Sequence, residues 1–431
     1  YFEVSNMDCE ASYTFNIINL VKHKSQYEYG MMPLMFSVKE SNCGRGGWMR
    51  IGSDIFYYRN NYVSNRDEQF LDKKTSNAND KNMREFYYTL SFTIKFKHSL
   101  DICYFAYHYP YTYSYLLTNI WNLTRRFNPN TVYFRCESLC DSLNQNQIPV
   151  ITITASDNKI EDRELIVLTS RVHPGESNSS WLIDGIIKFL TGDEKTAAKL
   201  WNTYVFKIVP MLNVEGVVNG CHRCGLSNED LNRKWKSPHP VLHPEIFHTK
   251  GLIAFYSDVL KRSPYLYCDF HGHSLKKNIF LYGCSANESC RPGDKEIKEN
   301  EAEFSILSRL LEQCSLIFDP KSSHYKIHKS KESTARITIW REFGVTRSYT
   351  MESTYCGFNT GSFKDNHINI NHLLDMGTSV CIALSALYDE TQCMFEFNRS
   401  QEKAGLSFNG KLNDNGSSHD CSSTSSIPLA E

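Results

Sequence analysis

Hydrophobic and polar positions follow two different patterns along the chain. In the N-terminal part, apolar or aromatic residues alternate with polar or charged ones over Tyr88–Phe96, which is the period expected for a half-buried antiparallel strand. Shorter strand-like runs lie at 15–18, 34–38, 48–51 and 55–58. Several short strands separated by turn residues predict an N-terminal antiparallel β-sandwich domain over residues 1–115.

Two segments of this region have a distinctive composition. Residues 60–85 are rich in Asn, Asp and Lys, so we expect a solvated, disordered insertion. The aromatic run from Tyr104 to Tyr113 contains no Lys or Arg. Because nucleic-acid platforms combine stacking rings with basic residues, this run predicts packing between domains and no nucleic-acid partner.

After about residue 116 the pattern changes to apolar runs that alternate with segments of helical periodicity. The expected strands are 150–153, 165–168, 204–209, 266–271, 279–282 and 348–352. The expected helices are 177–190, 248–261, 301–314 and 371–388. This alternation predicts an α/β domain over residues 116–391, built on a mixed, mostly parallel twisted sheet flanked by helices.

Residues 392–431 form a polar, serine-rich segment, for which we expect a disordered tail. Inside it, the stretch from Gly405 to Leu412 is close to a phosphate-binding loop. Leu412 stands where that loop needs the Ser or Thr that holds magnesium, and no strand precedes the stretch. We therefore expect no nucleotide site there.

Composition narrows the class of protein. The 431 residues exceed the roughly 250–300 at which single cores divide, so two domains are expected. The net charge of −1 gives no global reason for a nucleic acid or an anionic membrane as partner, and we find no run of about 18 apolar residues that predicts a membrane span. The 15 cysteines are odd in number and scattered through apolar stretches, which predicts reduced thiols in a cytoplasmic protein.

The candidate chemistry begins with His173 and Glu176, which lie between an apolar run and a segment of helical periodicity. Pro174 and Gly175 keep the pair out of a helix interior. Open α/β sheets carry their sites in such strand-to-helix turns. The spacing of His173 and Glu176 also arises by chance. The position of the pair in a strand-to-helix turn is therefore the reason for the hypothesis that both residues bind one catalytic zinc.

A catalytic zinc needs a third protein ligand. His271 and His273 share one face of the strand expected from residue 266, and either could reach the metal. Glu352 ends another apolar strand and is the candidate general base.

Basic side chains between these candidates indicate the substrate. Arg223 and Arg233, with Asn232 beside the latter, would suit a terminal carboxylate and an oxyanion, because a guanidinium matches a carboxylate with two hydrogen bonds. In the absence of a metal, surface salt bridges explain the same residues equally well.

Taken in order, His173, Glu176, Asn232–Arg233, His271 and Glu352 resemble the metallocarboxypeptidase superfamily. The longer strings 171–176, 224–233, 269–274, 331–336 and 349–353 resemble the cytosolic carboxypeptidases, most closely the branch that shortens polyglutamate chains on tubulin. Segments 15–19 and 104–110 resemble that subfamily's N-terminal β domain, so the resemblance extends over residues 13–388.

The resemblance implies the metallocarboxypeptidase fold and one Zn²⁺ per chain, bound by His173, Glu176 and His271. It assigns Asn232 and Arg233 to the substrate's terminal carboxylate, Arg223 to the oxyanion and Glu352 to general base and acid catalysis. Two features depart from the family. Residues 213–216 read Asn-Val-Glu-Gly in place of Asn-Pro-Asp-Gly, and the tyrosine that closes over substrate in the digestive enzymes has no matching position.

The implied function is removal of glutamates from acidic protein tails, with tubulin as the first expected partner, in the cytoplasm and also at microtubules or in the nucleus. Lys277 and Arg336 are basic residues near the expected site that could pair with an acidic side chain. Four lysines could steer an acidic tail toward it: Lys321, Lys326, Lys329 and Lys331. Two alternatives stay open, a zinc acylase of the aspartoacylase type and a non-catalytic module that binds microtubule tails.

Overall fold

The computed structural model describes residues 1–63, 86–125, 131–157, 159–192 and 195–403. Residues 1–387 form one compact unit and residues 388–431 a second. Most of the insertion expected at 60–85 and the loop from Gly405 to Leu412 lie outside the described residues, whereas Asn60–Val63 belong to a strand. The boundary expected near residue 115 therefore divides two sheet systems inside one compact unit.

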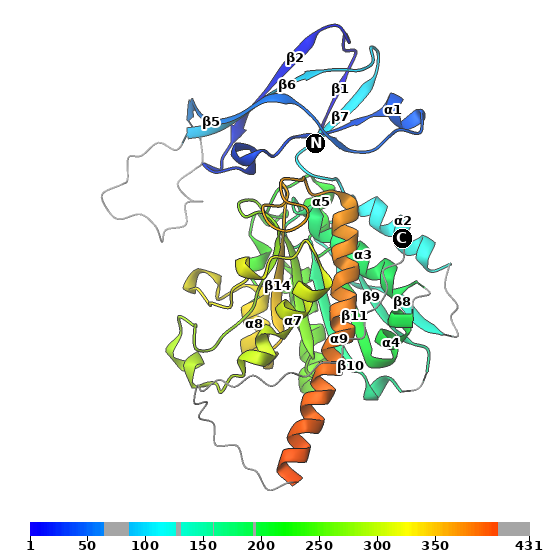
Figure 1. The fold of residues 1–431 in the computed structure, drawn as a ribbon, viewed down its shortest axis with the longest axis vertical. Helices are drawn as coiled ribbons and strands as arrows, with labels where there is room; N and C mark the ends of the chain where they lie inside the picture. The colour runs from blue at the N-terminus through cyan, green and yellow to red at the C-terminus, as the bar shows by residue number, and fades with distance from the viewer. Residues whose placement is uncertain (64–85, 126–130, 158, 193–194, 404–431) are drawn as a thin grey trace. The chain divides into compact units, whose positions relative to one another are not determined.

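Two antiparallel sheets form the N-terminal part (Figure 1). The first contains, in order, β1 (Phe2–Ser5), β7 (Ile102–Ala106), β3 (Leu34–Ser37) and β4 (Met49–Arg50). The second contains β2 (Ser12–Leu20), β6 (Phe86–Lys95) and β5 (Ser53–Val63). Leu90, Phe92 and Ile94 of β6 are buried in one core with Phe105 of β7, so the alternating pattern of this strand correctly predicted its buried face.

A seven-stranded mixed sheet forms the centre of the second part. Its order is β13 (Ile279–Tyr282), β14 (Ser348–Thr354), β12 (Leu266–His273), β10 (Glu164–Ser170), β11 (Tyr204–Val209), β9 (Gln147–Ala155) and β8 (Val132–Asp141). Strand β10 pairs in parallel with β11 and β12, and β12 pairs in parallel with β14. Antiparallel strands complete both edges. The carboxyl ends of β10, β12 and β14 consequently lie at one edge, as three candidate site residues require.

Helices pack around this sheet, except for α1, which lies beside the N-terminal sheets (Figure 1). They are α1 (Val38–Asn42), α2 (Tyr113–Leu123), α3 (Ser177–Leu190), α4 (Lys195–Thr203), α5 (Val214–Val218), α6 (Pro244–Ala254), α7 (Glu301–Cys314), α8 (Ala335–Phe343) and α9 (Ile370–Lys403). Short helical turns lie at Gln26–Tyr29, Ile160–Asp162, Leu231–Arg233, Phe255–Val259, Pro292–Glu296, Pro320–Ser322 and Lys329–Lys331. Glycines bring α3 and α9 together, since a Cβ at Gly185 would lie 2.3 Å from the Leu374 carbonyl oxygen and one at Gly377 2.4 Å from that of Leu182.

The sequence pattern missed several elements. The first half of strand β8 alternates between exposed and more buried positions, but the aromatic Tyr133 lies on its exposed face, so its residues give no clear alternation of polar and apolar types. Helix α6 begins at Pro244, earlier than the expected residue 248, because proline fits the first turn of a helix. Helix α9 extends to Lys403, past the expected end at 388 and into the segment predicted to be a disordered tail.

Helix α9 also bears on the membrane prediction. Its segment Ile370–Thr391 has a mean hydropathy of 1.3, and 56% of that stretch is buried inside the structure. By length and composition alone the segment could cross a membrane. A helix of the protein core meets the same criteria, and the close contact of Gly377 with α3 agrees with that interpretation.

Candidate metal centre

The turn after β10 is held by a buried arginine. Arg171 has a positive φ of 58° and is 5% exposed. Its Nε donates to the carbonyl oxygen of Pro174 over 2.8 Å, and its Nη1 donates to Tyr111 O and Ser180 Oγ over 3.1 and 2.9 Å. These bonds fix the backbone on both sides of His173.

Gly175 allows a second loop to approach this turn. Its amide donates to the carbonyl oxygen of His222 over 2.8 Å. A Cβ at Gly175 would lie 2.5 Å from that oxygen, which is far too close for any side chain. The glycine therefore sets the position of the loop that carries Arg223.

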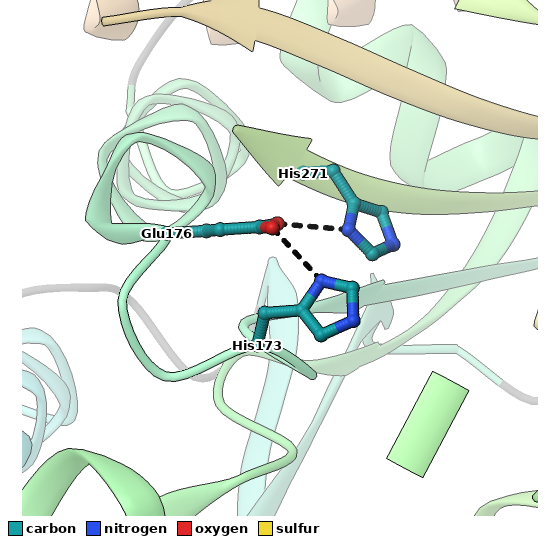
Figure 2. A group of neighbouring side chains, drawn as sticks. All are labelled: His173, Glu176 and His271. Carbon is teal, nitrogen blue, oxygen red and sulfur yellow. Dashed lines mark hydrogen bonds and ion pairs between the residues drawn. The ribbon is translucent and has the colours of Figure 1, made fainter. Parts of the chain in front are cut away.

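Three side chains meet at the carboxyl ends of β10 and β12 (Figure 2). Nδ1 of His173 lies 2.8 Å from Oε1 of Glu176, and Nδ1 of His271 lies 2.8 Å from Oε2 of the same carboxylate. Potential ligand atoms of the three residues all lie within 4.8 Å of one another. This is the one group of three potential ligands found in the part of the chain that the structure describes.

Each imidazole is also held from its other side. Nε2 of His173 lies 3.0 Å from Oδ1 of Asp230, and Nε2 of His271 lies 2.7 Å from Oδ2 of Asp269. Burial lowers the pKa of both imidazoles, but the neighbouring carboxylates outweigh burial and raise each pKa overall. The centre thus favours positive charge.

This arrangement fits a zinc ion. Two histidines and one glutamate are an established donor set for catalytic zinc. An Nε2–H that donates to a carboxylate leaves Nδ1 as the free base and fixes the ring orientation, as is usual for metal-binding histidines. The second strand candidate, His273, lies outside the group, and its Nδ1 accepts hydrogen bonds from the amides of Leu275 and Lys276.

A cavity of about 430 Å³ opens beside the three residues. Glu352 lines it from the end of β14, opposite His271 in the parallel register. Burial raises the pKa of the Glu352 carboxyl above its ordinary value, and the charge of Glu176 adds to this effect. A carboxylate in this environment accepts a proton more readily than an exposed one.

Arg223 lies at the wall of the same cavity. Its Nε and Nη2 donate to Oδ2 of Asp230 over 3.0 and 2.6 Å. Because Asp230 also holds His173, one carboxylate orients both a potential metal ligand and the arginine predicted to stabilise an oxyanion.

Asn232 connects the cavity to α8. Its Oδ1 accepts a hydrogen bond from the amide of Ala335 over 3.0 Å, which brings the next residue, Arg336, beside it. Asn232, Arg233 and Arg336 all line the cavity. Arg336 is 6% exposed, and its Nη1 contacts Cys284 Sγ at 3.5 Å.

The cavity carries an excess of positive charge. Its lining contains two carboxylates, Glu176 and Glu352. Six side chains of the lining are Lys or Arg: Lys22, Arg223, Arg233, Lys326, Lys331 and Arg336. Burial lowers the pKa of Lys331, and the charges of Arg233 and Arg223 lower it further. An anionic ligand would relieve this repulsion.

The structure does not bring every predicted residue to this cavity. Lys277 is absent from its lining. The Lys277 charge instead acts on the thiol of Cys356, whose pKa burial raises and Lys277 partly lowers. The chain turns away after β12 ends at His273, which separates Lys277 from the site. Of the four lysines predicted to steer a tail, Lys326 and Lys331 line the cavity.

Other functional candidates were not assigned from the sequence. Asp230 and Asp269 appear in the motif strings, and their placement near expected ligands was the available signal. Lys22, Tyr282 and Tyr355 also line the cavity, and no local pattern distinguishes them. The two tyrosines matter because the sequence has no position that matches the tyrosine that closes over substrate in the digestive enzymes.

The unusual turn at 213–216 keeps an ordered geometry. Asn213 Oδ1 accepts from the amide of Gly216 over 2.8 Å, and its Nδ2 donates to the carbonyl oxygen of Val172. Glu215 is 3% exposed and accepts from Asn146 Nδ2 over 2.8 Å and from Ser142 Oγ. The substituted residue thus anchors the turn between β8 and β9 instead of entering the site. Cys221 and Cys224, on the loop nearby, are free thiols like the other described cysteines.

Comparison with known proteins agrees with the interpretation of this site as a zinc centre. The family model described as zinc carboxypeptidase matches residues 118–361. The chain is 47% identical over 399 residues to cytosolic carboxypeptidase 1 of Xenopus laevis, covering 90% of this chain and 32% of that protein. It is 44% identical over 400 residues to cytosolic carboxypeptidase 4 of Mus musculus, covering 90% of this chain and 35% of that protein. The chain therefore spans about a third of the length of these relatives.

Solved structures share the fold. A metallo-carboxypeptidase from Burkholderia cenocepacia superposes with a TM-score of 0.67 at 17% identity, covering 88% of this chain and 86% of that one. A metallo-carboxypeptidase from Pseudomonas aeruginosa, in complex with (2-guanidinoethylmercapto)succinic acid, gives 0.65 at 17% identity, covering 90% and 88%. With its mixed sheet, its His-Glu-His group and the matching family model, this chain belongs to the zinc carboxypeptidase family.

Proposed function

We propose that this chain is a zinc carboxypeptidase that removes glutamates from acidic protein tails, with glutamylated tubulin tails as the first substrate to test. The observation that carries this proposal is the charge of the cavity, where six Lys or Arg side chains surround two carboxylates beside the His-Glu-His group. Such a cavity favours a substrate with several negative charges.

His173, Glu176 and His271 are the proposed metal ligands, through Nδ1 of each histidine and the glutamate carboxylate. A bound Zn²⁺ supplies Lewis acidity toward a carbonyl and lowers the pKa of a bound water to about 7. Asp230 and Asp269 hold the histidine rings in the orientation that this binding needs.

Glu352 is the proposed proton carrier. Its carboxylate takes a proton from the attacking water and later donates it to the leaving amine, so the same oxygen atoms act first as base and then as acid. The raised pKa of this carboxyl suits both steps, because the group gains and loses a proton near neutral pH. Arg223 donates N–H groups toward the developing oxyanion.

Two further groups bind the residue that is released. Asn232 and Arg233 hold the terminal carboxylate, and Arg336 pairs with the side-chain carboxylate of the terminal glutamate. The buried guanidinium of Arg336 has no carboxylate within ion-pair distance among the described residues, and its backbone is tied to Asn232 through Ala335. Because a buried charge is costly without a partner, this guanidinium favours an anionic ligand.

The proposal includes location and partner. The relatives are named cytosolic carboxypeptidases, so we place the chain in the cytoplasm, and a tubulin substrate would bring it to microtubules. We also retain a nuclear location as a prediction of the same resemblance. The free thiols are compatible with a reducing compartment.

Mass spectrometry of glutamylated peptides with defined branching, incubated with the zinc-loaded protein, tests the proposal. We expect chelator-sensitive release of free glutamate, with Arg336→Gln losing at least about tenfold in kcat/KM on a terminal Glu relative to a terminal Gln. The peptides also distinguish chain shortening, branch-point removal and cleavage of gene-encoded glutamates.

Two outcomes would favour other functions. Hydrolysis of N-acetylaspartate without hydrolysis of peptides would identify an acylase of the aspartoacylase type. Tight binding of glutamylated tails without any turnover by the zinc-loaded protein would identify a binding module.

A further inference from the structure

Lys22 reaches the substrate cavity from the N-terminal sheets. It lies two residues after Leu20, the last residue of β2, and it lines the cavity together with residues of the central sheet. Its Nζ donates to Oγ of Ser274 over 3.1 Å, across 252 positions of sequence. The Tyr57 hydroxyl donates to its carbonyl oxygen, which fixes the backbone from which the side chain extends.

The Lys22 ammonium has unused hydrogen-bonding capacity. An ammonium group has three N–H donors, and among the described residues the Lys22 ammonium donates one hydrogen bond, to Ser274 Oγ. No described carboxylate pairs with it within ion-pair distance. Glu176, whose charge acts on Lys22, accepts from the amide of Gly272 and is one of the proposed zinc ligands, so it is already engaged. An incoming carboxylate would therefore find a free cation at this wall.

The position of Lys22 relative to the site indicates which part of a substrate it meets. Its charge interacts with those of Glu176 and Arg223, and it lies near His222 and His273, whose pKa values are lowered first by burial and then by charges that include Lys22. Arg336, in contrast, lies beside Asn232 through the bond to Ala335. Lys22 thus lines the cavity near Ser274 and the loop that carries His222 and Arg223.

A bound peptide would pass these groups in sequence. With its terminal carboxylate on Asn232 and Arg233 and its scissile carbonyl at the His-Glu-His group and Arg223, the preceding residue continues past Arg223. An extended chain advances about 3.3–3.6 Å per residue, so the side chain before the scissile bond falls next to the wall that Lys22 forms.

We propose that Lys22 of the N-terminal sheets forms a subsite for the acidic side chain that precedes the scissile bond, so that this region contributes directly to substrate selection. The inference rests on the proposed carboxypeptidase function and adds a second acidic residue to its substrate. Its ligand class is a carboxylate on the residue before the released glutamate.

Lysine suits this role in one further respect. Its ammonium acts as a compact point charge on a flexible stem, whereas arginine imposes a fixed planar geometry. A point charge can pair with a carboxylate that arrives from different directions, as in chains linked through α- or γ-carboxyl groups.

Two peptides that differ only before the scissile bond test the proposal. Both end in Glu, and one carries Glu and the other its neutral isostere Gln at the preceding position. We expect the zinc-loaded wild type to prefer the Glu peptide at least about tenfold in kcat/KM. Lys22→Met should reduce that preference about tenfold, mainly through KM, and Lys22→Arg should retain most of it.

Lys24→Met is the matched control, because Lys24 is exposed on the same segment and does not line the cavity. It should keep the wild-type preference. An equal loss by Lys22→Met on both peptides would show a purely structural role and overturn the subsite. An unchanged preference in Lys22→Met would overturn it as well.

The same assay separates this inference from the proposed function. If wild type releases glutamate from neither peptide nor from a glutamylated tail, the proposed function fails. If wild type cleaves both peptides with no preference, the subsite alone is wrong.

Discussion

The amide of Gly175 and the carbonyl oxygen of His222 are joined by a hydrogen bond of 2.8 Å. This bond connects the turn that carries two proposed zinc ligands to the loop that carries the proposed oxyanion arginine. The relative position of metal and Arg223 consequently depends on a residue without a side chain.

Gly175→Ala should lower kcat/KM by about 10–100-fold, because a Cβ would lie 2.5 Å from the His222 oxygen and displace the loop, and small displacements of catalytic groups have effects of that size. Gly251→Ala is the control, since a Cβ there meets nothing within 4 Å in helix α6. Steady-state kinetics and zinc content by mass spectrometry measure the effect. Full activity of Gly175→Ala would show that the contact is not needed.

Glu352→Gln should reduce kcat by about 10²–10⁴-fold, the usual contribution of a positioned proton-transfer group. Zinc content should stay at one ion per chain, because Glu352 is outside the proposed ligand set. Retention of wild-type kcat by this variant would exclude the proton-transfer role assigned to this carboxylate.

Asp269→Asn should weaken zinc binding by about 10–100-fold, the usual effect of losing the partner of a metal-binding histidine. Asp269 is fully buried and holds His271 over 2.7 Å. Competition with a fluorescent chelator measures the affinity, and Asp258→Asn, an exposed position on the turn after α6, is the control. Equal affinities in the two variants would contradict the orienting role.

Removal of zinc from wild type with a chelator should abolish glutamate release, and re-addition should restore it.

Glu245→Gln should stabilise the protein above neutral pH. Burial raises the pKa of the Glu245 carboxyl to about 7, and Glu215 adds to this effect, while its Oε2 has no hydrogen-bond partner. The unfolded chain has a Glu pKa of about 4.3. Between these values the folded state binds more protons than the unfolded one, so wild-type stability falls as pH rises from about 4.3 to 7.

The expected gain for Glu245→Gln is about 3–4 kcal/mol at about pH 8 and close to zero at about pH 4, from the cost of ionising a buried acid. Denaturant unfolding of both proteins across this pH range measures the difference. A gain that is equal at both ends of the range would contradict the titration of Glu245 as its cause.

The sequence predicted an element correctly where the local pattern of polar and apolar residues matched the burial of that element in the folded chain. The alternation around Phe92 identified β6, and the apolar runs Leu165–Leu168 in β10 and Leu266–Cys268 in β12 identified central strands. Helix α8 was missed, because Ile337, Thr338 and Ile339 are β-branched and favour strands. Six of its residues, Ala335 to Trp340, are buried, and tertiary packing together with the left-handed cap at Gly344 gives a helix.

For the candidate site, too, the sequence revealed some relationships between residues and left others hidden. His173 and Glu176 lie three residues apart, so local spacing could reveal them. Lys22 and Ser274 are 252 positions apart, and nothing in either segment indicates their contact. Lys277 was expected at the site because it is close in sequence to His271, but the chain reverses direction between them. Proximity along the chain therefore predicted that His173 and Glu176 lie together, but it placed Lys277 wrongly beside the cavity.

The residues that follow β14 pack with the N-terminal part of the chain. Tyr355 and Cys356, three and four residues after Glu352, belong to the same buried cluster as Phe92 and Phe105 of the N-terminal sheets. Gln26 adds hydrogen bonds to Thr354 Oγ1 over 2.9 Å and from the amide of Tyr355 over 3.1 Å. Cutting the chain near residue 115 would expose this aromatic surface directly beside the proposed base. The N-terminal sheets thus pack in one folding unit with the strand that carries the proposed base. We expect a fragment that begins at residue 116 to lose cooperative stability.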